Sequence, residues 1–277
     1  MSFKTILTVL GVDNSDNDLQ TAADLCGQQG AHLSVLVVAM APPPPIGEYV
    51  SASTIWLEQR DRDRETLETA VEHARQIVSR TGNSFEIDGI YAEAGTADRD
   101  IGDRALYADL VLIGSSVLQH ADLKRQVING SLFQAMRPVM LIPGDKRPSL
   151  RPKTVLLAWD SRAEAARAAR EALEIMTSAA AVHVTLVDPE ASSAKSGEEP
   201  GADVAAYLTR HGINVTVDKL PSAGRPVASA LQQHAVDISA DMIVMGAYGH
   251  SRVRELIFGG VTKTMLDDAA IPIFMAR

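Results

Sequence analysis

Several residue types are scarce in this chain of 277 residues, and each shortage excludes a class of structure or partner. A single cysteine, Cys26, cannot form an internal disulfide, and its apolar neighbours predict a buried thiol, which fits a reducing compartment. Aromatic residues, at 4%, are too few for the stacking platforms that bind single-stranded nucleic acid. Positive charge is in deficit, and the net charge of −9 opposes binding to a nucleic-acid backbone or an anionic membrane. We therefore expect neither nucleic acids nor membranes as main partners.

Long apolar segments are also missing. The longest apolar run, residues 33–41, is about half of the roughly 20 residues that cross a bilayer. Residues 1–7 lead directly into a strand pattern, without the apolar core and cleavage site of a signal peptide. These features predict a cytoplasmic protein.

The residues that are plentiful indicate an ordinary globular chain, with 46% hydrophobic and 22% charged residues. At roughly 100–200 residues per domain, this length predicts two domains. The two halves resemble each other, because residues 3–13 recur as 152–160 and residues 108–114 recur as 240–246. A spacer at 144–150, rich in turn formers and charge, separates the halves. We therefore expect two tandem domains, residues 1–148 and residues 149–277.

Within each half, near-continuous apolar runs alternate with segments of helical period, a pattern typical of parallel strands covered on both faces. Strands are predicted at residues 5–12, 32–39, 84–91, 109–113, 138–142, 153–159, 182–188, 213–219, 241–245 and 271–275. Helices are predicted at residues 16–29, 53–80, 97–106, 122–135, 161–178, 201–211, 224–235 and 255–268. The sequence thus predicts an α/β fold in which each of two tandem domains has a five-stranded parallel sheet with helices on both faces.

The predicted helix at 53–80 is long and amphipathic. Its apolar face is expected to carry Leu57, Leu67, Val71, Ala74 and Val78, with charged residues opposite.

A glycine-rich motif follows the fourth strand of the second half. Gly246 and Gly249 are followed, after nine further residues, by Gly259 and Gly260 at the start of the last helix. Glycines at strand ends let the backbone approach a ligand closely, and a helix start offers unpaired N–H groups to an anion. Because ligands of open α/β sheets bind beyond the carboxyl ends of the strands, the motif predicts a phosphate-binding site.

The motif resembles the G-x2-G-x9-G-(S/T) pattern of the universal stress protein family, and the resemblance covers the whole chain as two tandem domains. It implies a stress-response regulatory protein that binds ATP, with or without Mg²⁺, in its C-terminal domain and signals through nucleotide-dependent contacts with a protein partner. It also implies that the last strands of the two domains pair around a pseudo-twofold axis, and it leaves a homodimer of the whole chain open. A nucleotide-free stress or scaffold protein acting only through protein contacts is the alternative function.

Carried over from this resemblance, Asp160 would contact the nucleoside, Val187 or Asp188 would lie near adenine, and the motif glycines would pass the ribose and hold the phosphates. The nucleotide-binding residues implied are Asp160, Val187, Asp188, Met245, Gly246, Gly249, His250, Gly259, Gly260, Val261 and Thr262. Gly260 stands where the family pattern usually has Ser or Thr, which keeps the backbone donor but removes a hydroxyl. For His250, a phosphate contact and an exposed loop position without a role are both open.

The first half lacks this motif. Gly114 is kept, but Val117 stands where Gly249 does, and a β-branched side chain narrows the approach that a phosphate needs. Alignment back from the prolines before the last strands puts Arg125 and Gln126 opposite the glycine pair. An alternative alignment uses Gly130 and Ser131 instead, but it shortens the last helix by more than a turn. We interpret residues 1–148 as a degenerate domain of the same family.

Signals for catalysis are weak. The sequence has no P-loop pattern, no dinucleotide fingerprint after the first strand and no nucleophile elbow. The histidines are scattered, and no pair has the i, i+4 spacing of a helical metal site, so no metal ion is expected. We therefore expect a protein that is not an enzyme, with ATP hydrolysis slow and incidental at most.

Overall fold

The computed structural model describes residues 3–13, 15–41, 50–93, 95–144, 148–189, 199–247 and 260–277. The chain divides into two compact units, Phe3–Arg137 and Pro138–Arg277. The predicted boundary between residues 148 and 149 lies later in the chain than the observed one between Arg137 and Pro138. The difference arises because the strand Val139–Leu141 belongs to the second unit.

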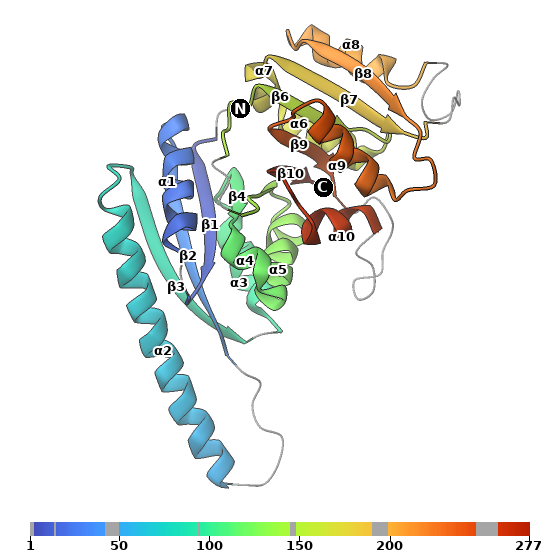
Figure 1. Cartoon of the computed structure of the whole chain (residues 1–277). Coiled ribbons are helices and arrows are strands. Elements are labelled where there is room, and N and C mark those ends of the chain that lie inside the picture. Colours follow the sequence, from blue (N-terminus) through green and yellow to red (C-terminus); the bar gives the residue numbers. More distant parts are fainter. Residues whose placement is uncertain are drawn as a thin grey trace. The chain divides into compact units, whose positions relative to one another are not determined.

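The first unit is an α/β sheet layer (Figure 1). In chain order its elements are β1 (Thr5–Gly11), α1 (Asp16–Gln29), β2 (His32–Ala41), α2 (Val50–Val78), β3 (Phe85–Glu93), α3 (Ala97–Ala105), β4 (Leu110–Ile113), α4 (Ser115–Gln119), α5 (Ala121–Ile128) and the π-helical turn η1 (Asn129–Gln134). The strands are parallel and lie in the order β3-β2-β1-β4.

The second unit repeats this order. Its elements are β5 (Val139–Leu141), β6 (Thr154–Ala158), α6 (Ala163–Glu171), α7 (Leu173–Ser178), β7 (Ala181–Val187), α8 (Ala202–Arg210), β8 (Val215–Leu220), α9 (Val227–Asp237), β9 (Met242–Gly246), α10 (Gly260–Asp267) and β10 (Ile273–Ala276). Five strands are parallel, in the order β10-β9-β6-β7-β8, and β5 pairs antiparallel with β10. The expected meeting of the two last strands is therefore confirmed.

Helices cover both faces of each sheet. In β3, a side chain at Gly89 would meet Leu67 and Val71 of α2, whereas Glu86 and Asp88, of the opposite parity, form ion pairs with Arg104 of α3. Successive residues of a strand point to opposite faces, so α2 and α3 lie on opposite sides of the sheet. In the second unit, α8 follows Gly201, which lies against Leu186 and Val217, while α9 carries His234, which contacts Asp218.

All ten expected strands are present, each within two residues of its predicted ends. The helices show three differences: α4 was not expected, residues 122–135 form α5 and η1, and residues 161–178 separate into α6 and α7 at Ala172. The first residues of the helix expected at 255–268 lie outside the described part, and α10 accounts for the rest.

The expected apolar face of α2 is correct over its C-terminal part and wrong at its start. Leu67, Ala74 and Val78 are buried, but 55% of Leu57 is exposed. The 29 residues of α2 span about 43 Å at ~1.5 Å per residue, whereas the nine residues of β3 span about 30 Å. The helix therefore extends past the sheet, and its first turns have no strand beneath them (Figure 1).

Among the residues described, no helix is both long enough and apolar enough to cross a bilayer.

Candidate functional site

The predicted ligand site lies where the strand order of the second unit reverses. From β6 the chain continues to β7 on one side, while β9 lies on the other side of β6. Ala158 at the end of β6 is paired with Met245 of β9 and Thr185 of β7, so the three strands end together. Asp160, Asp188 and Gly246 therefore lie at the same edge of the sheet, where open α/β sheets bind ligands.

Asp160 forms the turn between β6 and α6. Its carboxylate oxygen Oδ1 accepts a hydrogen bond from the Arg162 backbone N–H at 3.1 Å, and Arg162 Nε lies 3.6 Å from Oδ2. Ser161, between them, has a positive φ of 61°, which tightens the turn. The exposed carboxylate is thus held at the strand end, and its oxygens can accept further hydrogen bonds, for example from ribose hydroxyls.

Val187 and Asp188 end β7 next to β8. Asp188 adopts a left-handed φ of 47°, donates its backbone N–H to Leu220 O at 2.9 Å and accepts the Ser222 N–H at 2.9 Å. Hydrogen bonds from the side chain and the backbone N–H of Ser222 hold the pKa of the Asp188 carboxyl below its ordinary value. Asp188 therefore ties the two strand ends together, and the half-buried Val187 is the apolar neighbour that a base would meet at this edge.

Gly246 ends β9 in close contact with α6. A Cβ at this position would lie 2.5 Å from Ala165 N and 2.6 Å from Glu164 C, so any larger residue would push the first turn of α6 away. The preceding Met245 has its side chain in the core, at 4% exposure, and can meet a ligand only through its main chain. The glycine therefore permits close packing of β9 against α6, and the approach of a ligand to this position stays a prediction.

Gly260, Val261 and Thr262 are the first described residues of α10. Gly260 is exposed among the described residues, and no described atom lies within 4 Å of the Cβ that it lacks. The first N–H groups of a helix have no partner within the helix and can donate to an anion. The Thr262 side chain is buried, so the donors on offer in this turn are backbone N–H groups. Gly249, His250 and Gly259 lie outside the described residues.

The matching position in the first unit is filled by a side chain of the protein itself. Asp18 of α1 is 5% exposed and lies against Gly114, where a Cβ would be 2.3 Å from its Cγ. Its Oδ1 accepts hydrogen bonds from the Ser115 N–H and hydroxyl at 3.2 and 3.1 Å, and its Oδ2 accepts those of Ser116 at 2.9 and 2.5 Å. The internal carboxylate of Asp18 thus accepts the hydrogen bonds that the N–H and hydroxyl groups at the end of β4 can donate.

The second unit has Ala165 where the first has Asp18. Both residues lie five positions after the aspartate that follows the first strand of their unit, Asp13 or Asp160, and both are buried. Asp18 contacts Gly114 through its carboxylate, whereas Gly246 contacts the backbone of Glu164 and Ala165 and the Cβ of Glu164. Sequence reasoning missed this difference, although a lone aspartate on the apolar face of α1 was a possible signal.

The alternative phosphate pair of the first unit is closed. A Cβ on Gly130 would lie 2.5 Å from Asp98 O and 2.9 Å from Gly102 N, so this glycine serves the packing of η1 against α3. The side chain of Ser131 is fully buried. The alignment that gives the first unit no phosphate glycines fits these contacts better.

Comparison with known proteins agrees with this division of the chain. Residues 152–277 match the family model described as the universal stress protein family. The chain is 34% identical over 80 residues to the stress response protein NhaX of Bacillus subtilis, over 29% of this chain and 46% of that protein. It is 38% identical over 48 residues to the universal stress protein Slr1230 of Synechocystis, over 17% of each chain. The matches thus span less than half the length of these curated relatives.

A solved universal stress protein from Archaeoglobus fulgidus has the same fold over the whole chain. The TM-score is 0.68 at 18% identity, and the match covers 100% of this chain and 97% of that one. Residues 3–137 share the strand order of the matched segment, with β3-β2-β1-β4 corresponding to β8-β7-β6-β9. Residues 152–277 therefore form a domain that matches the universal stress protein family, and the chain as a whole has the fold of this solved universal stress protein.

Proposed function

We propose that the C-terminal unit binds an adenine nucleotide, with ATP as the ligand, at the carboxyl ends of β6, β7 and β9. The observation that carries this proposal is the exchange of Asp18 for Ala165 at matching positions beside Gly114 and Gly246. The first unit satisfies its strand-end donors with an internal carboxylate, whereas alanine at the same place supplies no anion. The N–H of Ala247, which matches Ser115, donates to Ala276 O at 2.8 Å, so what Ala165 leaves beside Gly246 is a place without a competing carboxylate, where a phosphate would meet no fixed anion.

The described residues fit the parts of a nucleotide. The exposed Asp160 carboxylate would accept hydrogen bonds from ribose hydroxyls, and Val187 would pack against the base. The backbone at Gly246 and the first N–H groups of α10 would lie along the phosphates. Mg²⁺ bound to the phosphates would offset part of their charge, and Asp160 offers oxygen atoms of the kind that Mg²⁺ prefers.

The same donors indicate a binding role without catalysis. Backbone N–H groups stabilise negative charge but cannot accept a proton from water, and the Asp160 carboxylate would be occupied by the ribose hydroxyls. We therefore propose that the nucleotide state is read by a regulatory protein partner during stress, and that turnover of ATP is not the function.

The experiment is a comparison of two variants of the full chain at one position. Ala165→Asp would place a second anion beside the phosphates, and we expect it to weaken ATP binding at least tenfold, which is about 1.4 kcal/mol. Ala165→Asn adds similar bulk without charge and separates repulsion from steric hindrance. Asp18→Ala is the matched control in the other unit and should leave the affinity unchanged. Unaltered binding by a folded Ala165→Asp protein would contradict the proposal.

One observation favours the alternative function of a nucleotide-free scaffold. The hydroxyl that the family pattern places beside the phosphates is absent at Gly260, and the hydroxyl of Thr262 is attached to a buried side chain. Native mass spectrometry of the purified chain distinguishes the two functions. Retained adenine nucleotide supports the sensor, and a protein that stays unliganded at millimolar ATP supports the scaffold.

A further inference from the structure

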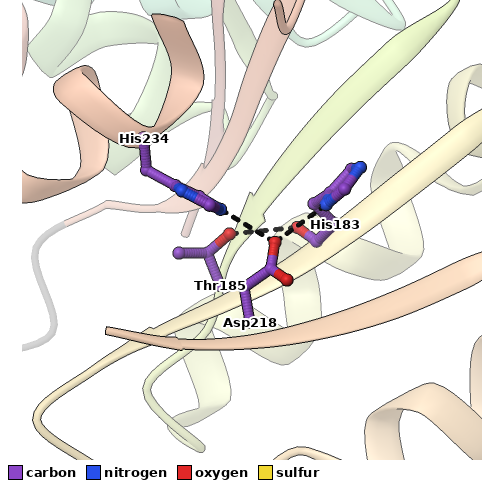
Figure 2. A network of polar contacts seen from close by, with 4 residues as sticks. All are labelled: His183, Thr185, Asp218 and His234. Atoms are coloured by element: carbon purple, nitrogen blue, oxygen red, sulfur yellow. Dashed lines mark hydrogen bonds and ion pairs between the residues drawn. The ribbon is translucent and has the colours of Figure 1, made fainter. Parts of the chain in front are cut away.

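Two histidines and an aspartate of the second unit meet at one carboxylate oxygen. Nδ1 of His183 and Nε2 of His234 each lie 2.8 Å from Oδ2 of Asp218 (Figure 2). The three residues come from β7, β8 and α9, and their side chains are 21%, 16% and 20% exposed for His183, His234 and Asp218. The cluster is therefore largely enclosed, yet it remains open to small solutes.

The sheet register brings these residues together. Asp218 of β8 is paired with Thr185 of β7, and His183 lies two residues before Thr185. His183 and Thr185 point to the same face of the sheet, and α9 packs on β7 at this face. The Thr185 hydroxyl donates to the His183 carbonyl oxygen at 3.3 Å, beside the cluster (Figure 2). Three separate elements thus fix the positions of the three side chains.

The donor atoms of the cluster suit a cation. The Asp218 carboxylate offers oxygen atoms, and each histidine offers a ring nitrogen. A neutral imidazole can direct either ring nitrogen at a partner, so the two rings can change from donating to Asp218 to ligating a metal by exchanging tautomers.

We propose that His183, Asp218 and His234 form a binding site for a divalent transition-metal ion, with Zn²⁺ as the ligand and water completing its coordination. Two imidazole nitrogens and a carboxylate oxygen are a donor set that Zn²⁺ accepts, and the three atoms lie within 4.8 Å of one another. At ligand distances of about 2.0–2.2 Å, tetrahedral zinc holds its ligand atoms roughly 3.3 Å apart. The two N···O distances of 2.8 Å would each lengthen by about half an ångström, and the two ring nitrogens, which lie within 4.8 Å of each other, would take a similar separation.

The identity of the ion follows from the donors. Mg²⁺ and Ca²⁺ prefer sites made wholly of oxygen atoms, so a site with two imidazoles discriminates against them. Divalent ions of the first transition series should bind in the order Co²⁺ below Ni²⁺ below Cu²⁺, with Zn²⁺ weaker than Cu²⁺. The expectation from sequence spacing that no metal site exists considered only histidine pairs on one helix, whereas this cluster is assembled from β7, β8 and α9.

The test uses the full chain after treatment with a chelator and without nucleotide. Calorimetry should show one Zn²⁺ per chain, and Zn²⁺ should raise the melting temperature, because the ion would link β7, β8 and α9 in the folded state only. Addition of Co²⁺ should give the visible absorption of a site with nitrogen ligands. Mg²⁺ at the same concentration should neither bind in the calorimeter nor raise the melting temperature.

Variants assign the binding to these residues. His234→Asn and Asp218→Asn should each weaken Zn²⁺ binding at least tenfold. His73→Asn is the matched control, because His73 contacts a single carboxylate, Asp16, at 2.8 Å in the other unit, and its loss should leave Zn²⁺ binding unchanged. If His234→Asn does not fold, two other measurements test the site. One is Zn²⁺ binding by Asp218→Asn, which keeps the size of the side chain, and the other is the Co²⁺ spectrum of the unaltered chain. The proposal would be overturned if the unaltered chain bound no Zn²⁺, or if a folded Asp218→Asn protein bound Zn²⁺ as tightly as the unaltered chain.

Discussion

Asp18 and Ala165 occupy matching positions on the first turns of α1 and α6, and they give the two strand ends beside them opposite chemistry. The carboxylate of Asp18 accepts four hydrogen bonds from Ser115 and Ser116 in a buried position. Removing it would leave those donors without an acceptor, which costs more than the hydrogen bonds themselves contribute. In the second unit an alanine leaves the place beside Gly246 without an anion.

Asp18→Ala is therefore expected to destabilise the folded chain by about 2–4 kcal/mol. Asp18→Asn should cost less, because an amide keeps one oxygen acceptor. Urea unfolding followed by circular dichroism measures both variants. A loss below about 0.5 kcal/mol for Asp18→Ala would show that these hydrogen bonds contribute little.

The motif glycine outside the described residues permits a second substitution. Gly249→Val gives the second unit the residue that the first has at Val117, and it should weaken ATP binding at least tenfold while the melting temperature stays close to that of the unaltered chain. Val117→Gly is the reciprocal control, and it should create no new ATP site because Asp18 remains in place. A folded Gly249→Val protein with full affinity would remove this position from the phosphate site.

At the scale of the elements, α2 shows where packing ends. Leu67 faces the sheet and is 8% exposed, whereas Leu57, on the first turns, is 55% exposed. We expect Leu67→Ala to destabilise the chain by about 2–4 kcal/mol through the cavity that it leaves. Leu57→Ala, the same change on the same helix, should alter stability by no more than about 0.5 kcal/mol. Equal losses in chemical unfolding would mean that the first turns of α2 are packed.

The same element shows what the sequence can predict. The strands were located correctly because parallel strands buried on both faces read as continuous apolar runs, as in β1 and β4. The exposure of Leu57 on the apolar face of α2 could not be predicted, because periodicity reports a helix face but not the length of the sheet beneath it. The site was predicted through its glycines, but Asp18 and the meeting of His183, Asp218 and His234 depend on contacts between distant elements. No local pattern encodes such contacts.

At the scale of the whole chain, two copies of one fold have different surfaces at the same strand ends. We expect the chain to turn over ATP far more slowly than the roughly 10 per second typical of enzymes, because the proposed site provides N–H donors rather than a general base. A steady-state phosphate-release assay with Asp160→Asn as the comparison tests this. Turnover near one per second that disappears in Asp160→Asn, while ATP still binds, would identify an ATPase instead.

The most direct measurement of the central claim is the stoichiometry of ATP binding to the full chain by isothermal titration calorimetry. We expect one site per chain, weakened at least tenfold in Ala165→Asp and unchanged in Asp18→Ala. Two equivalent sites would contradict the assignment of the ligand to the second unit, and no heat at millimolar ATP would contradict nucleotide binding itself.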